Sequence, residues 1–173
     1  MQLGRAAETL VEDFEDVWSI NSVVVSGGAV FLGTSPNGGI YKYSLGKLTK
    51  IYPAQSQDNK DADSNQTEDT DVVKAEQHLS NEHIFVMSSD VSGRLLAGVS
   101  GEKCILLRLE KDEMKTIFEP EDAKYIFGIT VDDTGNIYLG TGPEGKVYKL
   151  DSFGKKPQVI YCLLYTSDAA DDS

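Results

Sequence analysis

Short apolar stretches alternate with turn residues along most of the chain, most clearly in residues 125–161. Four strand-like stretches occur there, at 126–131, 137–141, 146–150 and 157–161, separated by turns rich in Gly, Asp, Asn and Pro. Such turn residues provide a positive or a fixed φ between strands. After Asp16, no long window keeps the period of about 3.6 residues that a helix requires. The pattern therefore predicts an all-β chain.

The same order of strands and turns occurs three times, which indicates a repeat architecture. The copies span 17–53, 82–122 and 123–161, and they align on Gly33, Gly98 and Gly140. The interval of 42 residues from Gly98 to Gly140 is typical of a four-stranded β-propeller blade. We therefore expect about three four-stranded antiparallel blades in an open arc, a partial β-propeller. The alternative is a β-sandwich with internal similarity.

The three aligned glycines predict where neighbouring blades come closest. Each follows the apolar residues of the second strand in its copy. A residue without a side chain suits a close approach of backbones, so we expect the blades to converge at these positions.

Both ends of the chain depart from the repeat. Residues 1–16 contain Thr9–Glu12, which is similar to the fourth strands of the copies, so we expect the end of a preceding blade there. Residues 162–171 resemble a translated sequencing adaptor, and 162–173 are expected to be an artefact; the alternative is a native C-terminal segment. On this interpretation the natural protein continues beyond both ends.

Charge is concentrated in one insertion between the first two copies. The net charge is −12, and residues 54–81 hold seven acids and two lysines with few large apolar residues. Such a segment cannot bury enough surface to offset ordering entropy, so we expect it to be disordered. The acidic balance argues against a nucleic-acid partner.

No apolar stretch approaches the roughly 20 residues of a membrane span, so no membrane insertion is expected. A cytoplasmic and an exported location fit the sequence equally well.

Antiparallel order predicts which loops share one side of the arc. The loops between second and third strands lie on the same side as the links between copies, and propellers commonly bind ligands on this side. The expected binding-face residues, two from each loop, are Ser35, Asn37, Ser100, Glu102, Pro143 and Glu144.

The sequence contains no pattern that predicts catalysis, a cofactor or a metal site. The histidines are His78 and His83, and no set of Ser or Cys with His and an acid occurs. Cys104 lies in the strand-like stretch Lys103–Leu109 and is interpreted as a packing residue. Asp132 begins a turn and is expected to bond to its own backbone rather than to a metal ion.

The last copy resembles known propeller repeats. Gly128–Leu139 is similar to the repeat core of NHL and gluconolactonase-type propellers, and Ile137–Asp151 is similar to PQQ-like repeats. PQQ-like repeats usually end in Trp, whereas these copies end in Tyr52, Phe118 and Tyr161. The metal ligands of gluconolactonase-type enzymes have no convincing equivalents here, so no site residue is carried over.

Two functional interpretations follow. The first is a non-enzymatic binding or scaffold domain that contacts a protein or a glycan through the loop face. The second, which the resemblance implies, is a metal-dependent lactonase- or lyase-like propeller enzyme whose active site lies in blades outside this sequence.

Overall fold

The computed structural model describes Thr9, residues 17–53 and residues 80–163. Every regular element in these ranges is a strand, which confirms the predicted all-β chain. The strands are β1 (Ser19–Ser26), β2 (Ala29–Ser35), β3 (Ile40–Ser44), β4 (Lys47–Tyr52), β5 (His83–Ser89), β6 (Leu95–Ser100), β7 (Ile105–Glu110), β8 (Glu113–Phe118), β9 (Tyr125–Val131), β10 (Ile137–Gly142), β11 (Lys146–Leu150) and β12 (Gln158–Cys162).

These strands form three separate four-stranded antiparallel sheets, each a meander of consecutive strands: β1–β4, β5–β8 and β9–β12. The predicted unit of four strands is therefore present in each copy. The predicted strand at Thr9–Glu12, apart from Thr9 itself, lies outside the described residues, as do the acidic insertion up to residue 79 and the tail from residue 164. Cys162, placed in the tail by the sequence interpretation, ends β12 opposite Lys146.

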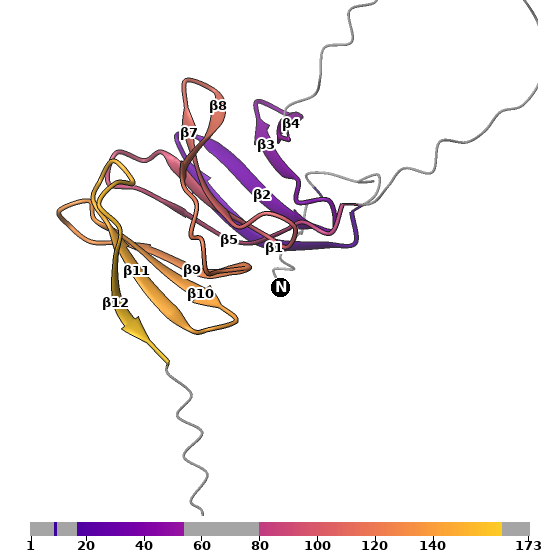
Figure 1. The fold of residues 1–173 in the computed structure, drawn as a ribbon. Helices are drawn as coiled ribbons and strands as arrows, with labels where there is room; N and C mark the ends of the chain where they lie inside the picture. The colour runs from indigo at the N-terminus through magenta and orange to yellow at the C-terminus, as the bar shows by residue number, and fades with distance from the viewer. Residues whose placement is uncertain (1–8, 10–16, 54–79, 164–173) are drawn as a thin grey trace, which may run out of the picture.

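The sheets stack face to face in chain order (Figure 1). β5 contacts β1 and β2 of the first sheet, and β9 contacts β5 and β6 of the second sheet. The middle sheet is therefore covered on both faces, and every residue of β6 is buried. A strand buried on both faces carries a continuous apolar run rather than an alternating one, as β6 does.

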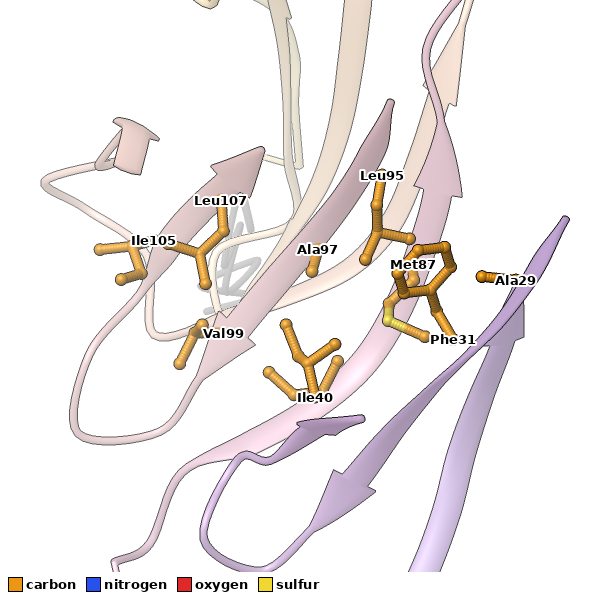
Figure 2. Close-up of a cluster of buried hydrophobic side chains, with 10 residues drawn as sticks. Ala29, Phe31, Ile40, Met87, Leu95, Ala97, Val99, Ile105 and Leu107 are labelled. Carbon is orange, nitrogen blue, oxygen red and sulfur yellow. The ribbon is translucent and has the colours of Figure 1, made fainter. Parts of the chain in front are cut away.

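Two apolar cores fill the spaces between the sheets. The first core, drawn in Figure 2, joins the first and middle sheets and contains Ala29, Phe31, Ile40, Ile84, Met87, Leu95, Ala97, Val99, Ile105 and Leu107. The second joins the middle and third sheets and contains Leu96, Cys104, Leu106, Ile126, Ile137, Leu139, Tyr148 and Leu150. Successive residues of β6 thus point into different cores, because side chains alternate along a strand.

Two of the aligned glycines each receive a side chain from the next sheet. A Cβ on Gly33 would lie 2.6 Å from Cγ2 of Ile84, and a Cβ on Gly98 would lie 2.8 Å from Cγ2 of Ile126. Both isoleucines are fully buried. The sequence predicted close approach at these glycines, but the approaching group is an isoleucine side chain rather than a backbone.

Three aspartates organise turns with similar hydrogen bonds. Asp90 and Asp132 follow the first strands of their sheets, and Asp151 follows the third strand of the third sheet. In the third sheet, Oδ1 of Asp132 accepts hydrogen bonds from the backbone N–H groups of Thr134 and Asn136, at 3.0 and 2.9 Å. The Asn136 side chain and the Tyr138 hydroxyl donate to Oδ2 at 2.9 and 3.0 Å. These bonds hold the pKa of Asp132 well below its usual range. The interpretation of Asp132 as a turn residue is confirmed.

The Asp132 turn predicts a pH-dependent contribution to stability. Asp132→Asn should lower the melting temperature at pH 7, because a neutral amide cannot accept all of these bonds. Ionised Asp132 stabilises the folded chain above the pKa of the unfolded state, about 4, and this contribution is lost as the pH falls further. The difference between wild type and variant should therefore shrink below about pH 4 in melting curves. Asp133→Asn, at the exposed neighbour, is the control; a difference that is constant with pH contradicts the assignment.

The contact of Gly33 with Ile84 predicts strong coupling between the two positions. Gly33→Ala should destabilise the fold by about 1–3 kcal/mol through overpacking, and Ile84→Ala by about 2–5 kcal/mol through a cavity. In the double variant the new methyl group fills part of the space that the isoleucine leaves. The loss for the double variant, measured by urea unfolding, should be clearly smaller than the sum of the two single losses. Additive losses would show that the methyl group added at position 33 and the Ile84 side chain do not occupy the same space.

Candidate functional site

The three loops selected from the sequence lie where the first strands begin. The β2–β3 loop approaches the start of β5, because the N–H of Gly38 donates to the carbonyl of Glu82 at 2.8 Å. The β6–β7 loop approaches the start of β9 in the same way, with the N–H of Gly101 donating to Lys124 at 3.0 Å. We call this end of the structure the loop face.

Two of the six predicted residues belong to the framework beneath this face. Ser100 is fully buried, and its hydroxyl accepts a hydrogen bond from the N–H of Ile126 at 2.9 Å. Ser35 is 8% exposed, and its hydroxyl accepts from the side-chain amide of Asn21. Ser100 therefore links the middle sheet to the third and presents no surface to a ligand.

The other four predicted residues lie in the loops themselves. Glu102, Pro143 and Glu144 are exposed, and Asn37 is half-buried with a φ of 65°. Glu144 forms an ion pair with Lys146 at 2.6 Å. This carboxylate, together with Asp122, holds the pKa of Lys146 above its usual range. The charge of Glu144 is therefore already partly neutralised within the sheet.

A row of aromatic side chains crosses the loop face on the first strands. The rings of His83 and Phe85 stack with centroids 5.1 Å apart. Phe85 lies 5.7 Å from Phe127, which in turn lies 5.5 Å from Tyr125. We call these four residues the aromatic row. Phe127 is 60% exposed, so the row presents ring surface to solvent.

The sequence analysis missed the aromatic row, although a signal for it exists. Each of the two strands begins with a ring, an isoleucine and a second ring, at 83–85 and at 125–127. The isoleucine side chain fills the space beside the glycine of the preceding sheet. A register shift follows the isoleucine in both strands. A bulge of this kind re-aims side chains and is common beside binding sites.

A pocket of about 330 Å³ adjoins His83 at the edge of the row. Its lining residues are Trp18, Ser19, Ser35, Pro36, Ser80, Asn81 and His83. Trp18 is 81% exposed. The lining thus combines ring surface with hydroxyl and amide groups and contains no Lys, Arg, Asp or Glu among the described residues. Nδ1 of His83 is buried and has no hydrogen-bond partner within that same part of the chain.

No catalytic group is evident within residues 17–53 and 80–163. In those ranges, no three His, Cys, Asp or Glu side chains are grouped closely enough to hold a metal ion. Cys104 is buried in the second core. Burial, and then the charge of Glu119, raises its pKa to about 11, so the thiol stays protonated at neutral pH. Packing is therefore the role that its position supports.

In the described part of the chain, no helix has the length and apolar character needed to cross a membrane.

The likeness of this chain to known proteins concerns the fold alone. No family model and no curated protein matches the chain, so the resemblance to NHL, gluconolactonase-type and PQQ-like repeats stays unconfirmed. Two similar solved structures are extracellular domains from B. thetaiotaomicron, one named for a hybrid two-component system and one for a one-component system. The first is 19% identical with a TM-score of 0.49, covering 76% of this chain and 16% of that one. The second is 16% identical with a TM-score of 0.50, covering 83% and 22%.

A third similar structure is a protein of unknown function from Bacteroides caccae. It is 14% identical with a TM-score of 0.49, covering 88% of this chain and 48% of that one. The chain therefore spans less than half the length of each of these three structures. At such identities the likeness concerns the all-β fold.

Framework and surface residues of the loop face should respond differently to substitution. Ser100→Ala leaves the buried N–H of Ile126 without its acceptor and should cost about 1–3 kcal/mol of unfolding free energy. Glu102→Gln, two residues further on and exposed, should change it by less than about 0.5 kcal/mol. Urea unfolding measures both variants. Equal stability of the two variants would contradict the framework role of Ser100.

Proposed function

We propose that the three sheets are consecutive blades of a β-propeller arc and that the arc is a non-enzymatic binding domain. The stacking supports the first part: each sheet is a four-stranded meander, and the first strands of successive sheets are in contact. The middle sheet is covered on both faces, as a blade within a ring is. The first strand of the first sheet, β1, still exposes apolar side chains, with Val23 at 58% and Val25 at 72%.

The observation that carries the binding function is the aromatic row beside the pocket. Exposed ring surface next to hydrogen-bonding groups is costly to leave in water, and such surfaces are typical of recognition sites. Phe127 and Trp18 are 60% and 81% exposed, at the same end of the structure. Phe127 lies on β9, and Trp18 directly precedes β1 with its backbone N–H bonded to the carbonyl of Ser35 at 2.9 Å. These positions hold the two rings in place before a ligand arrives.

We propose a neutral glycan as the ligand. The apolar C–H face of a sugar ring packs on an aromatic ring, and its hydroxyls exchange hydrogen bonds with hydroxyl and amide groups. The pocket offers these groups through Ser19, Ser80 and Asn81 beside Trp18. A charged ligand finds no charged side chain among the described pocket residues. A protein partner would use the same exposed rings, and the experiment below separates the two.

The test is calorimetric titration of the full chain with a panel of neutral oligosaccharides. Trp18→Ala and Phe127→Ala should each weaken binding at least about 10-fold, the loss typical of a central aromatic contact. Phe153→Ala is the matched control, since Phe153 is 70% exposed but lies in the turn between β11 and β12, at the opposite end of its sheet. Circular dichroism verifies that each variant folds.

Three results would contradict this proposal. One is the absence of binding across the panel, which would favour a protein partner. Another is equal weakening by the Phe153 control, which would remove the aromatic row from the site. The third is turnover of a lactone with a bound metal ion, which would establish the enzymatic alternative.

A further inference from the structure

A second pocket lies between the middle and third sheets, both of which belong to the described part of the chain. It has a volume of about 330 Å³ and shares no residue with the aromatic row or with the pocket beside that row. Its walls include Glu119, Glu121 and Asp122 from the link between β8 and β9, and the rings of Phe118 in β8 and Tyr148 in β11. We call it the acidic pocket, because its described lining holds three carboxylates and no Lys or Arg.

Two rings form the buried wall of the acidic pocket. Phe118 and Tyr148 have ring centroids 5.5 Å apart and planes inclined at 57°. Tyr148 is only 6% exposed and belongs to the second core, but its hydroxyl makes no hydrogen bond to a described residue. The oxygen is not sealed in the core, because Nδ1 of His83 is the only fully buried side-chain nitrogen or oxygen without a partner in that part of the chain. A buried tyrosine usually bonds through its hydroxyl, so this group is available to a ligand in the pocket that Tyr148 lines.

Two of the three carboxylates keep an uncompensated charge. Asp122 pairs with Nζ of Lys146 at 3.1 Å, whereas Glu119 and Glu121 form no ion pair with a described residue. Burial, and then the charge of Glu119, raises the pKa of Cys104 in the second core to about 11, so the field of Glu119 reaches the space between the two sheets. The acidic pocket therefore has a negative potential that attracts a cation.

The arrangement fits an organic cation better than a metal ion. The carboxylates of the pocket, like all other His, Cys, Asp and Glu of the described residues, are not grouped in threes closely enough to hold a metal ion. They surround a wall of rings instead, and the face of an aromatic ring attracts an ammonium group. The volume of about 330 Å³ lies at the small end of ligand pockets, which suits a short alkyl chain with one charged end.

We propose that the acidic pocket binds a small primary amine in its ammonium form. The ammonium group donates a hydrogen bond to the Tyr148 hydroxyl, and Glu119 and Glu121 offset its charge. The alkyl part packs against Phe118 and the proline rings that also line the pocket. The site is independent of the glycan proposed for the loop face, because the two sites share no residue.

NMR titration of the isotope-labelled full chain with n-butylamine tests the proposal. This amine is ionised at pH 7, as a lysine side chain is, and n-butanol is an uncharged probe of similar shape. The amine should shift the backbone amides of the pocket residues saturably. The affinity for n-butanol should be at least about 10-fold lower, since it lacks the charged donor.

The role of the hydroxyl is tested by Tyr148→Phe, which should weaken amine binding about 10-fold by removing a hydrogen bond to a charged group. Tyr161→Phe is the matched control, at an exposed tyrosine of the same sheet outside the pocket, and should leave the affinity unchanged. Without amine, Tyr148→Phe should melt no lower than wild type, because the hydroxyl that it removes has no partner among the described residues. Clear destabilisation would mean that the hydroxyl is already bonded in the fold, and it would overturn the proposal.

The role of charge is tested with two pairs of substitutions. Glu119→Gln with Glu121→Gln should weaken amine binding at least about 5-fold. Glu113→Gln with Asp133→Asn removes the same charge at exposed positions outside the pocket and should have little effect. Equal weakening by both pairs would mean that the amine responds only to the net charge of −12. That result would overturn the proposal, as would a lack of saturable n-butylamine binding or equal binding of n-butanol.

Discussion

Successive sheets of this protein are held together where an isoleucine of one sheet occupies the space that a glycine leaves in the sheet before it. The contact occurs between Ile84 and Gly33 and again between Ile126 and Gly98. It determines how closely the sheets approach, and both apolar cores are built around it. A larger residue at either glycine would separate the sheets and remove dispersion contacts along the whole interface.

The candidate binding surface arises from the same strand positions as this packing. In β5 and β9 the buried isoleucine lies between two rings, and the register shift beside it interrupts the regular ladder. The inward side chain anchors the strand, so the flanking rings of the aromatic row are held on a rigid element. The candidate binding surface and the core are therefore coupled through a few residues of β5 and β9, and a ligand bound there would need little further ordering of the protein.

Polar groups maintain the arrangement at both ends of the sheets. At the loop face, the buried Ser100 hydroxyl satisfies a backbone N–H of the neighbouring sheet, a group that would be expensive to leave unpaired. At the opposite end, Asp90, Asp132 and Asp151 each bond to the backbone of their own turn. The first kind of contact joins two sheets, whereas the second kind is local to one turn.

This difference in range separates what the sequence by itself determined from what the tertiary structure decided. Strands, turns, the threefold repeat and the role of Asp132 follow from residues near one another in the chain, and they could be predicted because Gly, Asp and Pro restrict φ locally. Three features could not be predicted in this way. They are the burial of Ser100, the assembly of the aromatic row, and the difference between Gly98, beside which an isoleucine of the next sheet packs, and Gly140, beside which none does among the described residues. Each depends on which sheet packs against which face. The local sequence around equivalent residues of a repeat does not tell whether a neighbouring sheet covers them.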